Sequence, residues 1–376
     1  MTAHVLLVDL SRGDLGVRVG KALENIAGLE RVYETIHRYD SLRSSCVVLG
    51  GVNANFWAAG TNHPIGPTVI EGVILKNKKY KNWSAIAFGT DKSITIDTFN
   101  LVVSLRTPYG ILPVATFNER LDSTSVVVYT PYYGTSVPFV DISAILLASA
   151  DTVTDDLEGG NGVTALIDSV WSVSPEGGTL KAQFEYMTPP LANSLVPCRV
   201  TLVDTGFVPI PRNGGVLSFG RGAFPMFFSV MVGDTFTLES RLKPTVPVPV
   251  REMVSGSPRL LRNGQVSIEW QEEGLRKPRF VTHDYARTAI GISRDRRILI
   301  LVTVEPPDRR ARKRGASLET LAELLRIYGA SDGFNLDGGS SATMVVLGET
   351  VSPPRGNRLS RKVSTVLMVV KMVTGL

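Results

Sequence analysis

The stretch that decides the fold covers residues 287–304 and reads Arg287-Thr288-Ala289-Ile290-Gly291-Ile292, then Ser293-Arg294-Asp295-Arg296-Arg297, then Ile298-Leu299-Ile300-Leu301-Val302-Thr303-Val304. Both outer segments are apolar and rich in β-branched residues, which favour strands. The charged residues between them are typical of a turn. The pattern therefore predicts a β-hairpin.

A helix is predicted after this hairpin, because Ser317 is a good N-cap, Glu319 sits in the first turn and Gly329 follows as a stop. One face of this helix is apolar, with Leu318, Leu321, Ala322, Leu325 and Tyr328. Residues 334–336 are then predicted to form a short strand that ends in Asp337-Gly338-Gly339. Val363–Val373 is predicted to be one more buried strand.

The rest of the chain alternates short β-rich runs with turns, and one helix is predicted at about residues 22–39. We expect an α+β fold with a mixed, largely antiparallel sheet core and few helices. Three segments are predicted: 1–130 as the N-terminal part of the core, 131–250 as a β-rich inserted subdomain with Gly- and Pro-rich turns, and 251–376 as the C-terminal part of the core, which carries the main motifs.

Composition narrows the function classes. The chain has 376 residues, of which 43% are hydrophobic and 20% charged, as in a soluble globular protein. His4, His37, His63 and His283 are scattered, and Cys46 and Cys198 form no zinc-type spacing, so neither a metal nor another cofactor is expected. The net charge of +5 suits an acidic substrate. Nucleic-acid binding is not expected.

No stretch approaches the ~20 apolar residues that span a bilayer, so no transmembrane segment is expected. The apolar run Val5-Leu6-Leu7-Val8 has no basic residues before it and ends at Asp9. It is interpreted as a first strand and not as a signal peptide. The compartment stays open between the inside of the cell and a location reached after removal of a signal.

The main candidate for chemistry is the run Asn335-Leu336-Asp337-Gly338-Gly339-Ser340-Ser341. A strand that ends in Asp, two glycines and two hydroxyls can present a carboxylate at a sheet edge. It also lets a ligand approach the backbone closely, since glycine has no Cβ. The alternative for an isolated Asp-Gly-Gly is a tight turn in which Asp337 and Ser340 bind local amides.

Charged residues beside the hairpin give further candidates. Arg287 and Thr288 at a strand end are suited to bind a phosphodiester, and His283 with Asp284 could supply acid/base function. The alternative is a structural Arg287 that pairs with Asp284. The run from Glu305 to Arg314 is either a solvated loop or an attractor of anionic substrate.

Near the N-terminus, the run Gly50-Gly51-Val52-Asn53-Ala54-Asn55-Phe56-Trp57 follows a predicted strand. The side chains of Asn53 and Asn55 both donate and accept hydrogen bonds, which suits sugar hydroxyls. Phe56 and Trp57 are interpreted as core aromatics rather than as a stacking surface for a sugar. Asn118, Arg120 and the run 126–131 form a weaker constellation at another strand end.

Together these segments resemble the phosphodiester glycosidase family, which includes the lysosomal uncovering enzyme and bacterial exopolysaccharide-associated proteins. The resemblance rests on Arg287-Thr288-Ala289-Ile290-Gly291-Ile292, Gly315-Ala316-Ser317-Leu318 with its helix, Asn335 to Thr343, and Ser257-Pro258-Arg259-Leu260-Leu261-Arg262-Asn263-Gly264. The run from Val52 to Trp57 is similar to an N-terminal element of the family, and Asn118, Arg120 and Tyr129-Thr130 are also similar.

The chain departs from the family pattern at three positions. Glu305-Pro306 replaces an Asp-Gly pair, Ser340 replaces a third glycine, and Ala54 stands where the family tends to have glycine. The first change keeps a carboxylate but stiffens the loop, since proline fixes φ. The other two narrow the space for close backbone approach. Substrate identity is affected more than reaction class.

The resemblance implies cleavage of a sugar 1-phosphodiester at the anomeric carbon, giving free sugar and a phosphomonoester, and an extracytoplasmic or cell-envelope location. Asp337 would act as nucleophile or base, and Arg287 would stabilise the phosphate charge, with His283 and Glu305 as further catalytic candidates. The substrate-binding candidates are Asn53, Asn55, Thr288, Asn335, Gly338, Gly339, Ser340 and Ser341.

Two alternatives of other classes stay open. One is a non-catalytic binder of glycans or anionic polymers in the cell envelope. The other is a phosphodiesterase that cleaves P–O with a metal held by Asp337 and Glu305. Partners are therefore expected to be a phosphate-linked sugar or an anionic glycan.

Overall fold

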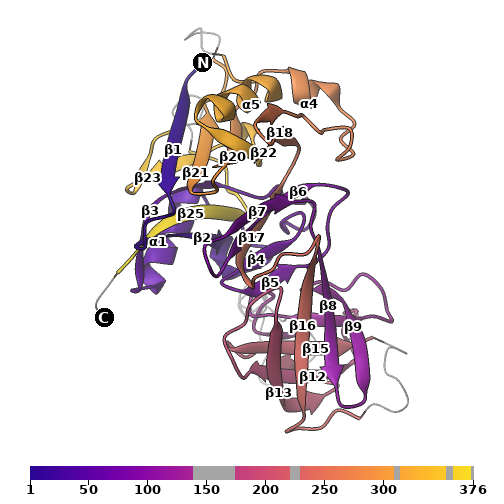
Figure 1. Ribbon diagram of the computed structural model, residues 1–376. Coiled ribbons are helices and arrows are strands. Elements are labelled where there is room, and N and C mark those ends of the chain that lie inside the picture. The colour runs from indigo at the N-terminus through magenta and orange to yellow at the C-terminus, as the bar shows by residue number, and fades with distance from the viewer. Residues whose placement is uncertain (139–173, 221–228, 309–313, 353–358, 374–376) are drawn as a thin grey trace, which may run out of the picture. The chain divides into compact units, whose positions relative to one another are not determined.

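The computed structural model describes residues 1–138, 174–220, 229–308, 314–352 and 359–373 (Figure 1). Strands dominate, helices are few, and the paired strands are antiparallel except for one parallel pair. The expected α+β class with largely antiparallel sheets is confirmed. Residues 309–313 of the charge run from Glu305 to Arg314 lie outside the described residues.

The chain forms two compact units. Unit 1 consists of Met1–Val102, Leu191–Ser194 and Arg241–Leu376, and unit 2 of Val103–Pro190 and Leu195–Ser240. The expected division of the chain into a core and an inserted subdomain, with boundaries at residues 130 and 250, stays a prediction.

A six-stranded sheet of unit 1 holds the predicted hairpin at its centre. The Arg287–Val304 register shows that the two hairpin strands pair antiparallel, as predicted. Helix α5 (Leu318–Ile327) packs its apolar face on this sheet in one buried cluster. Ser317 caps α5 by accepting the Thr320 N–H at 3.1 Å. In order across the sheet, the strands are β1 (Ala3–Asp9), β21 (Ile298–Val304), β20 (Arg287–Ser293), β22 (Ala330–Asn335), β18 (Arg259–Arg262) and β19 (Gln265–Val266).

Strand β22 begins at Ala330, four residues before the predicted start at Phe334. It therefore includes the polar run Ser331-Asp332-Gly333. This run is buried because Arg259 donates to Asp332 Oδ1 at 2.7 Å, which satisfies the buried carboxylate. Gly333 is required for the packing, since a Cβ there would lie 2.7 Å from the Ile290 carbonyl oxygen. The strand therefore depends on partners far along the chain.

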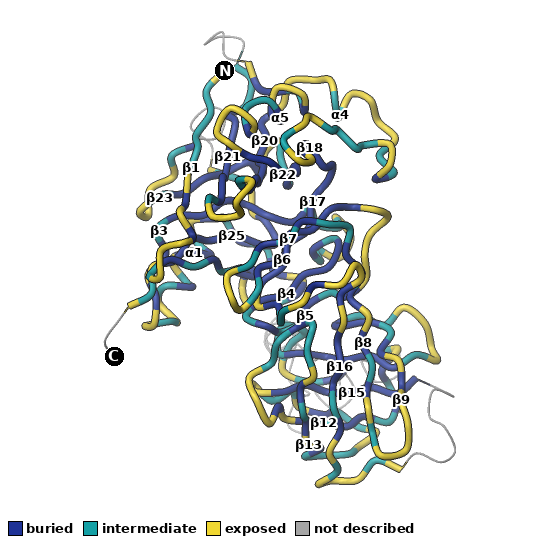
Figure 2. Tube along the Cα trace, in the orientation of Figure 1, coloured by how far each residue is buried: buried dark blue, intermediate teal, exposed yellow. Residues whose placement is uncertain are grey.

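A second sheet of unit 1 has five strands and surrounds the C-terminal strand β25. Its order is β2 (Leu15–Lys21), β25 (Thr365–Met372), β3 (Cys46–Asn53), β23 (Met344–Val346) and β24 (Glu349–Thr350). Helix α1 (Val32–Leu42) packs on it through Val32, Ile36 and Tyr39. These strands are largely buried in Figure 2.

The helix expected at residues 22–39 is wrong in its first half. Residues Ala22–Glu24 form a 3₁₀ turn, and α1 starts only at Val32. The Asn25 side chain accepts the Ala27 N–H at 2.9 Å, a local bond that competes with helix formation. Buried Lys21 also draws the loop inward, because its amine donates to the Gly28 carbonyl at 2.7 Å.

The third sheet of unit 1 is antiparallel and five-stranded, in the order β5 (Val73–Lys76), β4 (Thr68–Ile70), β17 (Val250–Gly256), β6 (Ser84–Gly89) and β7 (Ile94–Asp97). Short helix α4 (Pro278–Thr282) precedes β20. No described helix is long and apolar enough to cross a membrane. Cys46 is a buried free thiol, as is Cys198 in unit 2.

Unit 2 is organised around a closed barrel. Its strands follow the order β10 (Val126–Tyr129), β15 (Gly214–Phe219), β12 (Leu180–Tyr186), β13 (Leu195–Asp204), β16 (Thr235–Lys243), β8 (Asn100–Thr107) and β9 (Gly110–Phe117). Strands β11 (Ser136–Val137) and β14 (Val208–Pro209) form a small separate pair. Closure leaves no free edge among the barrel strands.

Candidate active site

Asp337 lies where three segments of unit 1 meet. Beyond the end of β22, the Leu336 N–H donates to the Thr288 carbonyl at 2.8 Å, and the Asp337 N–H donates to the Ala54 carbonyl at 3.0 Å. Ala54 in turn donates to the Thr365 carbonyl at 3.0 Å. The end of β3, the start of β20 and the start of β25 therefore fix the backbone that follows β22 and carries the carboxylate.

Asn53 ties these segments together from a fully buried position. Its Oδ1 accepts the Thr288 hydroxyl at 2.7 Å and the Thr343 N–H at 3.0 Å, and its Nδ2 donates to the Asp337 carbonyl. The structure thus brings together Asn53, Thr288 and Asp337, three of the residues that the sequence suggested. All recorded bonds of Asn53 go to protein groups, so its contribution is to hold the site in shape.

Asp337 is partly exposed, and the surrounding residues change the pKa of its carboxyl group. Burial raises the pKa of Asp337 to about 6, although the Ser341 side chain, the Gly338 N–H and the charge of Arg361 each act to lower it. The Gly338 N–H lies 2.9 Å from Oδ1. Asp337 is therefore mainly ionised at pH 7 and takes up a proton in mildly acidic solution.

The two glycines after Asp337 are needed for the local backbone. A Cβ on Gly338 would lie 3.0 Å from the Ala286 carbonyl oxygen, and Gly339 has a φ of +63°. The Gly339 N–H donates to the same Ala286 carbonyl at 2.8 Å. Residues Gly339–Ser341 form a 3₁₀ turn in which Ser340 is exposed and Ser341 is buried.

The other two predicted asparagines are both buried. Asn55 donates to the Ile65 carbonyl at 3.2 Å and to the Thr68 hydroxyl at 3.1 Å, and it accepts the Thr365 hydroxyl at 3.0 Å. Asn335 donates to the Ser257 carbonyl at 2.7 Å, while its Oδ1 has no hydrogen-bond partner among the described residues. Asn55 therefore supports the backbone, and Asn335 keeps one unused acceptor.

Arg287 is buried, and its guanidinium is largely occupied by the main chain. It donates to the carbonyls of Ala316 at 3.0 Å, His283 at 3.2 Å and Phe280. Burial lowers the pKa of Arg287 to about 10, so it stays charged at neutral pH. The alternative pairing with Asp284 is not recorded, and Asp284 instead lies 3.5 Å from Arg314.

His283 and Glu305 are the remaining predicted acid/base groups. His283 is exposed, and its ring stacks on Tyr285 with centroids 6.2 Å apart. Glu305 accepts from His4 at 2.9 Å. Within the described ranges, no group of three or more His, Cys, Asp or Glu residues could hold a metal ion.

Arg361, which the sequence motifs did not include, contributes a charge that acts on Asp337, and its guanidinium carbon lies 4.7 Å from the centre of the Trp57 ring. Trp57 and Phe56 are partly exposed, although both were interpreted as core aromatics. Phe56 packs edge-on against Trp83 at 5.3 Å. Arg361 and Trp57 are far apart in the chain, so no local pattern could have paired them.

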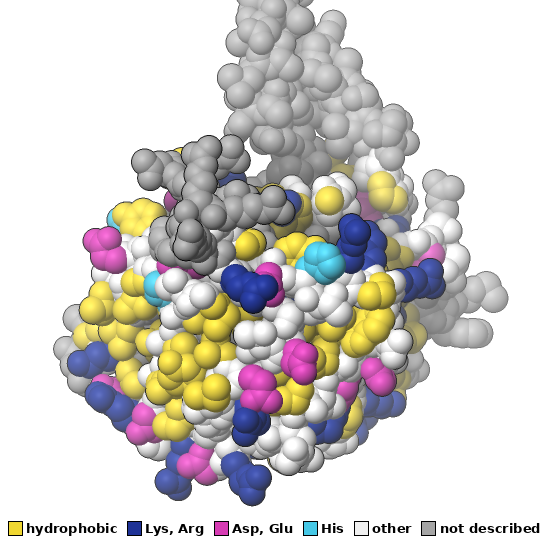
Figure 3. Space-filling model, turned by 90° about the horizontal axis from the view of Figure 1, so that it is seen from above, with side chains coloured by type: hydrophobic (Ala, Val, Ile, Leu, Met, Phe, Trp, Pro, Cys, Tyr) yellow, Lys and Arg dark blue, Asp and Glu magenta, His cyan; other side chains and the backbone are white. Residues whose placement is uncertain are grey.

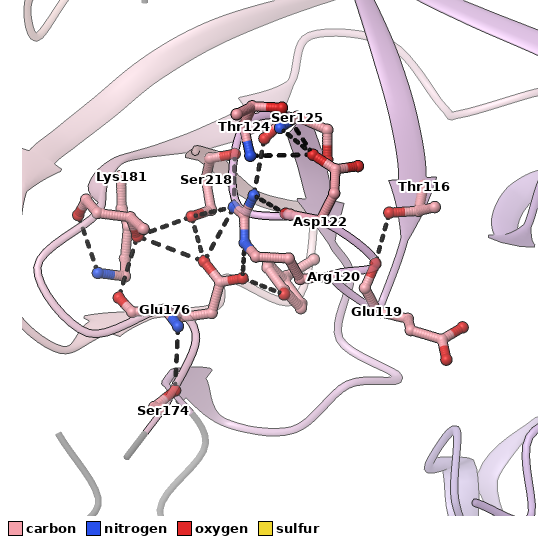
Figure 4. Close-up of polar contacts among 12 residues, drawn as sticks. Thr116, Glu119, Arg120, Asp122, Thr124, Ser125, Ser174, Glu176, Lys181 and Ser218 are labelled. Carbon is pink, nitrogen blue, oxygen red and sulfur yellow. Dashed lines mark hydrogen bonds and ion pairs between the residues drawn. The ribbon is translucent and has the colours of Figure 1, made fainter. Parts of the chain in front are cut away.

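Asn118 and Arg120 belong to unit 2, and Arg120 lies in a largely buried polar network with Glu176 and Ser218 (Figure 4). Arg120 pairs with Glu176, which also accepts from the Ser218 and Tyr129 hydroxyls. Burial acts to raise the pKa of Glu176, but these bonds together act more strongly to lower it. The pKa of Glu176 is therefore below its usual value. Each drawn partner is engaged by another protein group, which indicates a structural role for this network.

Charge on the visible face of Figure 3 is dispersed. Basic and acidic side chains alternate with apolar ones among the coloured residues, without a continuous basic surface. Any attraction of an anion to this face therefore depends on individual residues.

Comparison with known proteins gives the same family as the motifs. Residues 203–370 match the family model described as phosphodiester glycosidase. Over 136 residues, the chain is 35% identical to the proteins of Mus musculus and Homo sapiens named N-acetylglucosamine-1-phosphodiester alpha-N-acetylglucosaminidase. The match covers 32% of this chain and 25% of each relative, so it spans a quarter of the relatives' length.

Two solved structures share the fold over 98% of this chain. A hypothetical protein from Synechocystis has a TM-score of 0.64 at 19% identity, with 59% of its own chain covered. A putative exported protein from Burkholderia pseudomallei K96243 has a TM-score of 0.61 at 18% identity, with 73% covered. At these identities the likeness concerns the fold alone. Residues 203–370 are thus similar in sequence to the phosphodiester glycosidase family, and the family resemblance that the motifs suggested is confirmed.

Proposed function

We propose that this protein hydrolyses a sugar 1-phosphodiester at the anomeric carbon and releases free sugar and a phosphomonoester. The observation that carries the proposal is Asp337, a partly exposed residue with a raised pKa, whose backbone is bonded to Ala54 and which lies within the residues 203–370 that match the family. A perturbed carboxylate at a rigid, accessible position is the kind of group that glycoside hydrolysis uses.

In the proposed reaction, the bond between the anomeric carbon and the phosphate oxygen breaks, and an oxygen atom from water ends on the anomeric carbon. The phosphate leaves with the bonding electron pair, so it needs charge stabilisation more than protonation. Ionised Asp337 acts either as nucleophile on the anomeric carbon or as the base that takes a proton from water. The proton is finally taken up by the phosphomonoester or by solvent.

The predicted site residues divide into two proposed groups. Gly338, Gly339 and Ser340 would contact substrate, because they are partly or fully exposed beside Asp337. Ser341 lies next to the carboxylate, and Asn335 has an unused acceptor for a sugar hydroxyl. In the second group, Asn53, Asn55 and Thr288 would act by holding the backbone.

The other predicted catalytic residues are Arg287, His283 and Glu305, and their roles are part of the proposal. Arg287 would stabilise phosphate charge through its Nη1 atom, for which no hydrogen bond to a described residue is recorded. His283 would exchange protons at the exposed end of the same segment. Glu305, which is hydrogen-bonded to His4, would act as a further acid or base. A phosphate-linked sugar of an exopolysaccharide or cell-envelope glycan is the substrate class that this function implies.

The test is product analysis in ¹⁸O-labelled water with N-acetylglucosamine 1-(methyl phosphate) and a panel of related sugar diesters. Label in the free sugar, together with unlabelled methyl phosphate, is the expected result. Label in a phosphate product would instead indicate P–O cleavage by a phosphodiesterase. Binding of the diesters without turnover would favour a non-catalytic glycan-binding protein.

A further inference from the structure

Arg361 has donors for which the described part of the chain provides no acceptor. Its side chain is exposed, and no hydrogen bond or ion pair to a described residue is recorded for it. Its guanidinium carbon lies 4.7 Å from the centre of the Trp57 ring. Contact with an aromatic ring restrains a guanidinium while its N–H groups stay available at the edge of the plane.

The main chain places this pair at the candidate site. Trp57 follows Ala54 and Asn55 closely, and the Ala54 carbonyl accepts the Asp337 N–H. Arg361 leads into Thr365, which accepts the Ala54 N–H through its carbonyl and the Asn55 N–H through its hydroxyl at 2.9 Å. Both segments are therefore tethered to the backbone beside Asp337.

Arg287 differs from Arg361 in its freedom to bind a ligand. Three main-chain carbonyls accept from Arg287, and its side chain is buried. A group so engaged has few donors left for a phosphate, whereas an exposed guanidinium can present a fork of two N–H groups to two phosphate oxygens.

We propose that Arg361 binds the phosphate of the substrate, with Trp57 as the platform that holds its guanidinium. This proposal rests on the proposed function and names the phosphate-binding residue of the same site. As the bond to the anomeric carbon breaks, the departing phosphate goes from one negative charge toward two. Arg361 therefore binds the transition state more strongly than the bound substrate.

The kinetic test compares Arg361→Gln and Arg361→Lys with a matched control, Lys362→Gln. Lys362 is the exposed neighbour of Arg361, and its charge acts on Glu34 instead of Asp337. For Arg361→Gln we expect kcat/KM on N-acetylglucosamine 1-(methyl phosphate) to fall by about 10- to 100-fold, the usual scale for a charge-assisted bond. Lysine should restore part of the loss, and the control should stay within about 2-fold of the wild type.

The pH profile is a second measurement, and it would not change if Arg361 had a purely structural role. The Arg361 charge lowers the pKa of Asp337, so Arg361→Gln should shift the acidic limb of the pH profile upward from about 6. A loss of kcat/KM without this shift, equal in Arg361→Gln and Lys362→Gln, would overturn the proposal.

Calorimetric titration with inorganic phosphate separates this proposal from the proposed function. Wild type and Lys362→Gln should bind phosphate, and Arg361→Gln should bind it at least about 10-fold more weakly. If phosphate bound in this pattern but no sugar diester were hydrolysed, the hydrolase function would fail while the phosphate site held. If Arg361→Gln bound phosphate as the wild type does, or the wild type did not bind it, the assignment of Arg361 would fail whatever the turnover.

Discussion

Side chains with almost no exposed surface fix the backbone around Asp337, whereas Asp337 itself reaches solvent. Asn53 and Thr288 form one buried link, and Asn55 and Thr365 form another. Such groups pre-organise a site without touching the ligand. The carboxylate is thereby held in a partly desolvated environment that raises its pKa.

Asp337→Asn should remove activity without loss of stability. The raised pKa means that ionised Asp337 is disfavoured in the folded state, and this penalty grows as pH rises from about 4 to about 6. At pH 7 the asparagine variant should therefore match or exceed the wild-type free energy of unfolding, by up to about 2 kcal/mol. Urea unfolding and turnover of the sugar diester check the two halves. Full activity in the variant would remove Asp337 from the chemistry.

In the wild type, the same pKa predicts the acidic limb of the pH profile. If ionised Asp337 is required, kcat/KM should fall about tenfold per pH unit below pH 6. The measurement is kcat/KM against pH at constant ionic strength. Activity that stayed level down to pH 4 would show that the working group keeps an ordinary carboxylate pKa.

Asn53→Ala should act through stability as well as activity. Three partners, the Thr288 hydroxyl, the Thr343 N–H and the Asp337 carbonyl, would lose their bonds in a buried place. We expect a loss of about 2–4 kcal/mol in the free energy of unfolding, measured with urea. Asn82→Ala, which removes an exposed side-chain bond to the Glu272 carbonyl in the same unit, serves as comparison. Equal losses in the two variants would contradict the structural role of Asn53.

At the scale of elements, prediction from the sequence succeeded where structure is local. The hairpin β20–β21 and the capped helix α5 are specified by consecutive residues, such as Ser317 and the turn at Arg294. Prediction failed where contacts between residues far apart in the chain determine the structure. The polar start of β22 needs Arg259, and the turn before α1 is linked to buried Lys21. The same reason explains why the contact between Arg361 and Trp57 was not predicted.

Strand β22 should be sensitive to its buried ion pair. Asp332→Asn would leave the Arg259 guanidinium buried with a neutral partner, although its bonds to the carbonyls of Leu261 and Ile96 would remain. We expect a loss of about 3 kcal/mol in the free energy of unfolding. Glu323→Gln, which removes an exposed ion pair with Arg326 on α5, should cost less than about 0.5 kcal/mol. Similar losses in both variants would show that burial of the Arg259 pair does not matter.

At the scale of the whole molecule, the candidate chemistry is confined to unit 1, while unit 2 is organised around a closed barrel with its own polar network. Glu176 is nearly inaccessible and binds Arg120, Tyr129 and Ser218. A buried network of this kind stabilises the unit that contains it, and loss of one member leaves the others without partners.

Glu176→Gln should therefore weaken unit 2 without changing the chemistry of Asp337. The Arg120 charge would stay buried without its counter-ion, and we expect a cost of about 3 kcal/mol to the stability of that unit. Hydrogen exchange followed by mass spectrometry should show faster exchange in β10, β12 and β15, with little change in β20 and β22. The acidic limb of the pH profile should remain near 6, since Glu176 is not among the groups that act on Asp337. A shifted limb, or faster exchange spread evenly over both units, would mean that the network contributes to the active site and does not serve the barrel alone.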